Sequence, residues 1–200
     1  DVLLLYAVTG LLVMLCRSMS GRKLIWIGLG VTILLALLAA LGALAMNFAP
    51  PEIQASIAEQ KASMGGTPET IAASIANYRS GWSGMLHENF AAWVQLQVAS
   101  TFYIIPTLGL MLLGMGLFKT GFMAGRAPTG LYLLLIVLGG GVLAATGWYG
   151  WQEAFAAEGQ APMNGLVEAL NAFAFVITLA YMSVMILLAT RGPKLIAAVF

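Results

Sequence analysis

The sequence predicts an all-α fold, a polytopic transmembrane helix bundle with about five membrane-spanning helices in a single domain over residues 1–200. Hydrophobic residues make up 60% of the chain and charged residues only 8%, so the chain lacks the polar side chains that a water-soluble surface needs. The few charges lie between long apolar runs. These runs do not alternate between polar and apolar residues, which favours helices over a membrane-spanning barrel.

Five apolar runs carry the predicted spanning helices. Each is near or above the roughly 20 residues that a spanning helix needs, except the first, which is shorter. The predicted helices cover residues 1–16, 24–46, 90–118, 130–149 and 165–189. Pro106 lies inside the third run and removes one backbone hydrogen bond there, so we expect this helix to bend. Two rows of small residues four apart permit a close approach between helices, namely Ala36 with Ala40 and Ala39 with Ala43.

The connection over residues 47–89 is too long for a plain loop and carries two helix signals of its own. Pro51 opens the first signal. The second begins with Thr-Pro-Glu at residues 67–69, which supplies a cap, a first-turn proline and a first-turn acid. The apolar face of this second helix consists of Ile71, Ile75 and Tyr78. We expect two short amphipathic helices on the outer face of the bundle.

The basic residues indicate how the chain is oriented. Seven of the nine fall on one face when the predicted helices alternate in direction, and the positive-inside rule assigns that face to the cytoplasm. These seven are Arg17, Arg22, Lys23, Lys119, Arg126, Arg191 and Lys194. Lys61 and Arg79 lie on the opposite face, as do all eight acidic residues. The N-terminal end is therefore predicted to be extracytoplasmic.

Several classes of site are disfavoured by the sequence. It has no metal-binding motif, no phosphate-binding loop and no nucleophile elbow, and it contains one histidine and one cysteine, Cys16. We therefore expect no metal and no cofactor. The net charge of +1, without a basic stripe, argues against nucleic acid as a partner. The expected partners are the lipid bilayer and a small-molecule substrate.

Polar side chains near the predicted outer helix ends form the candidate substrate-binding site, because polar groups in a membrane usually face a partner or a water-filled cavity. The candidates are Asp1, Tyr6, His87, Glu168 and Asn171. Asp1 begins the first helix, and Glu168 lies near the start of the fifth. If these helices are neighbours, two nearby carboxylates favour a shared proton or a bound cation. Solvated helix ends are the alternative.

Two other pairs of polar residues lie in or near the third run. Gln95 and Gln97 point about 200° apart on a helix, so at most one of them belongs to a site. His87 and Glu88 are adjacent and form a possible proton-handling pair. A solvated position, without a functional role, is the interpretation we favour for that pair.

Two runs of the sequence resemble motifs of a known family. Residues 1–11 read D-V-L-L-L-Y-A-V-T-G-L, and residues 113–123 read L-G-M-G-L-F-K-T-G-F-M. Both resemble the YeiB-like family of bacterial inner-membrane proteins, which carry D-I/V-L-x-x-Y-x-x-x-G-L and later L-x-G-x-x-L-x-x-x-G-F/W. The matching residues are Asp1, Tyr6, Gly10, Gly114 and Gly121. The resemblance implies a central fragment of a longer protein in the bacterial plasma (inner) membrane.

The resemblance brings no established catalytic residue. The family is regarded as of unknown function, described as transport-related and distantly similar to membrane acyltransferases. The polar helix ends and the interrupted third helix favour transport of a small solute, which is our preferred hypothesis. A membrane-embedded acyltransferase is the first alternative, with His87 as its sole histidine base. A non-catalytic membrane scaffold is the second.

Overall fold

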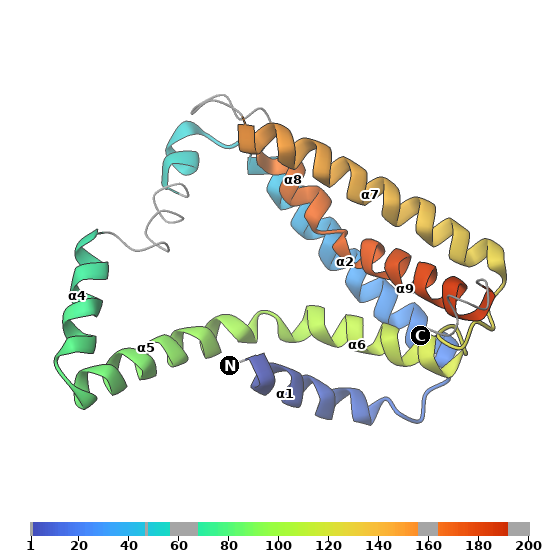
Figure 1. Ribbon diagram of the computed structural model, residues 1–200, viewed down its shortest axis with the longest axis horizontal. Helices are drawn as coiled ribbons and strands as arrows, with labels where there is room; N and C mark the ends of the chain where they lie inside the picture. The colour runs from blue at the N-terminus through green and yellow to red at the C-terminus, as the bar shows by residue number, and fades with distance from the viewer. Residues whose placement is uncertain (1, 47, 57–67, 156–163, 192–200) are drawn as a thin grey trace.

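The computed structural model describes residues 2–46, 48–56, 68–155 and 164–191, and the regular elements of these residues are helices (Figure 1). Three described helices are long and apolar enough to cross a membrane, judged by length and composition. They are α2 (Gly21–Met46), α7 (Thr129–Phe155) and α9 (Ala174–Arg191). The predicted all-α architecture with membrane-type helices is therefore confirmed for the described residues.

Among the described residues, fewer helices are long and apolar enough to span a membrane than the about five predicted. A fourth span is present if α5 (Trp82–Thr101) and α6 (Ile104–Lys119) are taken together as one broken helix. The helix α1 (Val2–Leu15) is apolar but has 14 residues, fewer than the roughly 20 that a spanning helix needs. The described part of the chain therefore has three or four helices of spanning length.

The bend predicted in the third apolar run is present. The axes of α5 and α6 differ by 59° across the break at residues 102–103. Pro106 has no N–H to donate to the carbonyl of Phe102, and in a straight helix its ring would clash with that carbonyl. The N–H groups of Phe102 and Tyr103 donate instead to carbonyls three residues back, which closes a tight turn. The proline thus accounts for the broken helix.

The prediction of one continuous helix over residues 165–189 is wrong. The structure breaks this run at residues 172–173 into α8 (Asn164–Asn171) and α9. No proline marks this break. Asn171 ends α8, and asparagine weakens a helix because its side chain competes for backbone hydrogen bonds.

The second amphipathic helix of the connection is present as α4 (Pro68–Arg79), which packs against α5. Polar groups make part of this contact, because Asn77 donates a hydrogen bond of 2.6 Å to a carboxylate oxygen of Glu88. Ile71 and Ile75 of the predicted apolar face remain 48% and 46% exposed. Figure 1 shows α4 at the far end of α5, so its placement over the outer ends of the bundle stays a prediction.

The rest of the connection is described only in part. Residues 51–56 are helical, where the first amphipathic helix is predicted, and residues 57–67 lie outside the described residues. Gly81 has a φ of 107°, which favours glycine, and it separates α4 from α5. The third predicted helix consequently begins at Trp82 and not at residue 90.

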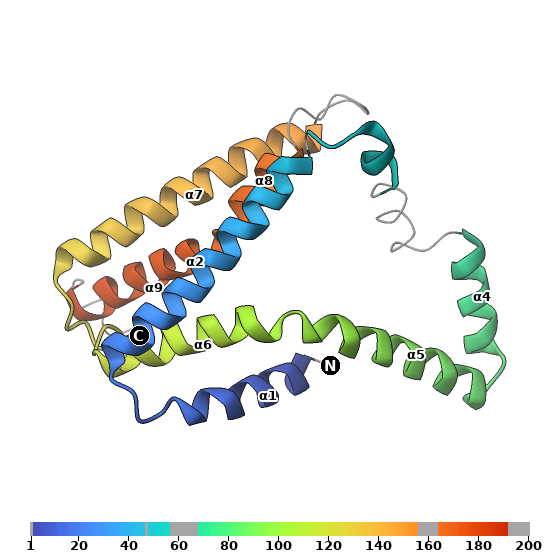
Figure 2. The same ribbon diagram turned by 180° about the vertical axis from the view of Figure 1, so that it is seen from behind.

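The helices form two arms that join at one end (Figures 1 and 2). One arm contains α2, α7, α8 and α9, in which α9 packs against α7 and α8 packs against both α2 and α7. The other arm contains the bent pair α5–α6, with α1 packed along it. The arms join where the first half of α2 contacts the second half of α6.

Glycines make the junction between α2 and α6 possible. A Cβ atom on Gly28 would lie 2.5 Å from the backbone nitrogen of Leu113, and one on Gly116 would lie 2.8 Å from the backbone nitrogen of Ile25. The two backbones can approach this closely only because these positions carry no side chain. Further buried small residues continue the stripe along α2, namely Thr32, Ala36 and Ala40. Of the two predicted rows of small residues, Ala36 and Ala40 are buried, whereas Ala39 is exposed and Ala43 is half-buried.

Large apolar side chains cover the outside of the helices. Trp26 on α2 is 73% exposed, and Val137 on α7 is 71% exposed. Among the described residues, three polar residues are buried, and the hydroxyl of each donates to the carbonyl four residues back in its own helix: Thr9, Thr32 and Ser183. An apolar exterior with internally satisfied polar groups is favourable in lipid and unfavourable in water. The surface therefore supports the membrane class that the sequence predicts.

The turn between α6 and α7 is closely packed. The hydroxyl of Tyr132 is buried and donates a hydrogen bond of 2.6 Å to the carbonyl of Phe122, whose ring centroid lies 4.7 Å from that of Tyr132. Gly121 and Gly125 have φ values of 77° and 72°, a conformation that other residues rarely adopt. Gly121 belongs to the second family-like motif, and here it allows the chain to reverse.

The basic residues gather where the two arms join. Figure 1 shows the α1–α2 turn, the α6–α7 turn and the end of α9 at this place. We call it the basic end, and its residues are Arg17, Arg22, Lys23, Lys119, Arg126 and Arg191. Arg79 lies far from it, at the end of α4. The structure therefore groups the basic residues as the sequence predicts, except for Lys61 and Lys194, which lie outside the described residues.

Candidate functional site

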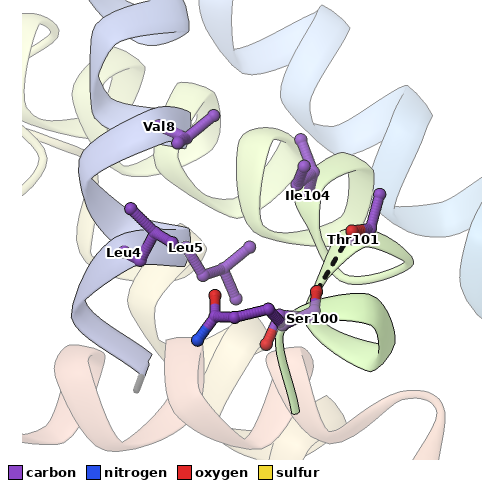
Figure 3. Close-up of a pocket in the computed structure, with 7 residues that line it drawn as sticks. Leu4, Leu5, Val8, Ser100, Thr101 and Ile104 are labelled. Atoms are coloured by element: carbon purple, nitrogen blue, oxygen red, sulfur yellow. Dashed lines mark hydrogen bonds between the residues drawn. The ribbon is translucent and has the colours of Figure 1, made fainter. Parts of the chain in front are cut away.

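A cavity of about 200 Å³ lies between α1 and the break that separates α5 from α6. In Figure 3 one side of this cavity is formed by α1, with Leu4, Leu5 and Val8, and the other by the broken helix, with Ser100, Thr101 and Ile104. The three α1 residues share one helical face. The break creates the cavity, because α5 bends away from α6 beside this face of α1. A straight helix would fill the space.

Gln97 also lines the cavity, one helical turn before the break. Its side-chain nitrogen is buried and has no hydrogen-bond partner among the described residues. An amide nitrogen carries two donors, and leaving such a group buried and unpaired costs about 1–3 kcal/mol. A ligand that places an acceptor beside this nitrogen would recover that free energy.

The two hydroxyl groups of the cavity have their protons engaged by the helix. Ser100 donates to the carbonyl of Leu96 at 2.7 Å. Thr101 donates to the carbonyl of Gln97 at 3.1 Å, which is the dashed line in Figure 3. A hydroxyl whose proton is used can still accept a hydrogen bond. The cavity therefore offers one vacant donor nitrogen and two acceptor oxygens on an aliphatic lining.

Among the residues that the structure describes, no charged side chain lines the cavity. An ion would lose most of its hydration there without gaining an opposite charge, which is strongly unfavourable. An uncharged molecule with a carbonyl-type acceptor on an apolar body matches the lining. A few polar groups on a mostly apolar wall are also typical of small-molecule sites.

Of the two predicted residues of the first helix, the structure describes only Tyr6, which does not line this cavity. Tyr6 is 49% exposed on α1. Leu4 does line the cavity, and Tyr6, two residues later in the helix, points about 200° away from Leu4. Asp1 lies outside the described residues. The pair formed by Asp1 and Tyr6 therefore stays a prediction.

The other predicted residues lie on two separate helices. His87 is exposed on α5, and Glu168 and Asn171 are exposed on α8. Since α8 packs against α2 and α7 while α1 packs against α5 and α6, Tyr6 and Glu168 belong to different arms (Figures 1 and 2). Within the described residues no three His, Cys, Asp or Glu side chains are placed to hold a metal ion. A substrate-binding role for these residues stays a prediction.

None of the described residues that the sequence predicted as the binding site lines the cavity. The statement that Gln95 and Gln97 cannot share a site is confirmed, because Gln97 lines the cavity while Gln95 is exposed. A polar residue inside an apolar run, shortly before Pro106, is the signal that could have singled out Gln97. The sequence could not show that α1 lines the cavity. An apolar helical face has the same sequence pattern whether it contacts lipid, another helix or a cavity.

Compared with models of protein families, with curated proteins and with solved structures, the chain matches none of them. The interpretation of the cavity therefore depends on its own chemistry.

Proposed function

We propose that the chain is a multi-pass protein of the bacterial plasma membrane that transports a small, uncharged solute by way of the cavity beside Gln97. One observation carries the proposal: Gln97, whose amide nitrogen is buried and has no partner among the described residues, lines a cavity at a break in a membrane-type helix. Substrate sites of transporters are commonly formed by discontinuous helices, where side chains and freed backbone groups bind the solute within the membrane.

The location in the bacterial plasma membrane and the membership of the YeiB-like family are also part of this proposal. They rest on the motif-like runs at residues 1–11 and 113–123, which resemble the YeiB-like family. That family is described as transport-related, which agrees with the chemistry of the cavity.

The two alternatives have less support from the geometry. An acyltransferase needs a general base beside its substrate, and His87 is exposed on α5 and does not line the cavity. A scaffold has no use for a cavity with an unpaired hydrogen-bond donor. Transport is therefore the function that the geometry supports best.

The orientation can be tested with single cysteines. After Cys16→Ala removes the native thiol, Ala76→Cys on α4 should react with an impermeant maleimide in intact cells. Ala124→Cys in the α6–α7 turn should react only after the cells are permeabilised, because the positive-inside rule places the basic end in the cytoplasm. Both positions are exposed in the structure. The opposite labelling pattern would show that the proposed orientation is inverted.

Binding can be tested by thermal unfolding of the purified protein with matched neutral and charged compounds. Butyramide and methyl butyrate should raise the melting temperature, whereas butyrate at the same concentration should not, because no described cationic side chain lines the cavity. A ligand at about 100 times its Kd stabilises the folded state by about 2.7 kcal/mol. Equal stabilisation by butyrate, or none by any neutral compound, would contradict the proposal.

Uptake by proteoliposomes then separates transport from binding. A compound that stabilises the protein should accumulate in vesicles that contain it and not in empty vesicles. Stabilisation without accumulation would reject transport and leave a binding protein.

A further inference from the structure

We propose that the basic end is a binding surface for the phosphate groups of anionic phospholipids. This inference uses the membrane class of the protein but is independent of the cavity and of solute transport. It rests on the continuity of the basic end, on the absence of acidic side chains from its described part, and on its position at the ends of membrane-type helices.

Contacts between three parts of the chain make the basic end continuous. The ammonium group of Lys119, at the end of α6, donates hydrogen bonds to the carbonyls of Arg17 and Met19, the second at 2.8 Å. These bonds fix the α1–α2 turn against α6. Gly21, at the start of α2, is close enough to Thr120 that a Cβ atom there would lie 2.9 Å from the side chain of Thr120.

The α6–α7 turn continues the surface toward α9. The side chain of Arg126 folds back over Gly121, where a Cβ atom would lie 2.8 Å from Cδ of Arg126. A Cβ atom on Gly125 would lie 2.8 Å from a side-chain carbon of Thr190. The next residue on α9, Arg191, donates a hydrogen bond from its guanidinium to the hydroxyl of Thr129. The turns that carry the basic residues are therefore held together by packing and not only by proximity along the chain.

Four cationic groups on this surface are available to a ligand. All six side chains of the basic end are exposed, and two of them, Lys119 and Arg191, are engaged by the hydrogen bonds described above. The other four side chains are those of Arg17, Arg22, Lys23 and Arg126. Their charged groups form no hydrogen bond or ion pair with any described residue.

No described acidic residue lies at the basic end. The acidic side chains that the structure describes are on the 51–56 segment, α4, the start of α5 and α8, all away from the junction of the arms (Figure 1): Glu52, Glu69, Glu88 and Glu168. Arg22 and Lys23 also occupy the first turn of α2, which contains no acid, so the helix dipole disfavours their positive charge. An external anion would relieve this repulsion.

The position of the surface selects the anion. The basic residues lie where α2 and α7 begin and where α9 ends, which is the depth of lipid headgroups for helices that cross a membrane. Arginine binds phosphate through two parallel hydrogen bonds, and basic residues near a membrane surface attract anionic lipids. Phosphatidylglycerol headgroups therefore match the surface in charge, geometry and location.

The test measures binding of phosphatidylglycerol to the intact protein in detergent, by native mass spectrometry and by the lipid-induced change in melting temperature. Phosphatidylglycerol should bind more tightly than phosphatidylcholine and should raise the melting temperature, and added salt should weaken both effects. Replacing Arg17, Lys23 and Arg126 by Gln should weaken phosphatidylglycerol binding by about fivefold for each charge removed.

Arg79→Gln is the matched control, because Arg79 is an arginine on α4, far from the basic end. It should bind phosphatidylglycerol as the unmodified protein does. Equal affinity for the two lipids, or equal loss in the control, would overturn the proposal. If inorganic phosphate alone raised the melting temperature as much as phosphatidylglycerol does, the proposal would also be overturned. The surface would then bind a soluble phosphate compound. If the triple variant does not fold, the lipid comparison and its salt dependence decide the question in the unmodified protein.

Discussion

Gly28→Leu is expected to prevent the two arms from joining. A Cβ atom at this position would lie 2.5 Å from the backbone nitrogen of Leu113 and 2.7 Å from the carbonyl oxygen of Gly109. These are backbone atoms, so the clash cannot be relieved by a change of side-chain rotamer. The helices must separate, and the loss of their packing should lower the free energy of unfolding by at least about 3 kcal/mol.

The measurement is the folded, monodisperse fraction of purified protein as a function of temperature, together with its abundance in membranes. Gly30→Leu is a matched control on the same helix, because a Cβ atom at Gly30 meets nothing within 4 Å. It should keep the abundance and the melting temperature of the unmodified protein. If Gly28→Leu were as stable as Gly30→Leu, the contact between α2 and α6 would not exist in the protein.

Gln97→Leu is expected to abolish solute binding without destabilising the protein. The substitution removes the unpaired donor nitrogen and leaves a side chain of similar size in the cavity. Since the nitrogen has no partner among the described residues, folding should become neutral to about 1 kcal/mol more favourable. Ligand-induced stabilisation and vesicle uptake should both disappear, because the solute loses its hydrogen-bond donor.

Gln95→Leu supplies the comparison for this variant. Gln95 is on the same helix, also carries an amide, and is exposed outside the cavity. It should retain solute binding and uptake. Full uptake by Gln97→Leu would remove the cavity from the transport route, whereas a large loss of stability would show that the amide has a structural partner.

The third apolar run shows how far sequence reasoning reached. Pro106 predicted a bend, and the 59° change of direction just before it confirms that prediction, since the missing N–H is a property of one residue. The break between α8 and α9 was missed, because no proline marks it and the asparagine at residue 171 weakens a helix without forbidding it. The sequence likewise could not show that α1 would lie beside the broken helix.

The candidate site was predicted only in part for the same reason. Periodicity correctly separated Gln95 from Gln97, because the turn of a helix is a local geometric rule. The proposed grouping of the first and last helices required knowledge of which helices are neighbours. The structure places Tyr6 with α1 and α6 in one arm and Glu168 with α8 in the other.

The sequence by itself determined the helical membrane class and the grouping of the basic residues at one end. Both follow from the transfer of backbone and charged groups between water and lipid, and this free energy depends on composition along one segment at a time. Only the tertiary structure decided that α2 and α6 touch through Gly28 and that Gln97 lines a cavity. Lipid is as apolar as a leucine side chain, so hydrophobicity does not choose between helix neighbours. That choice is made by the close fit of backbones at small residues.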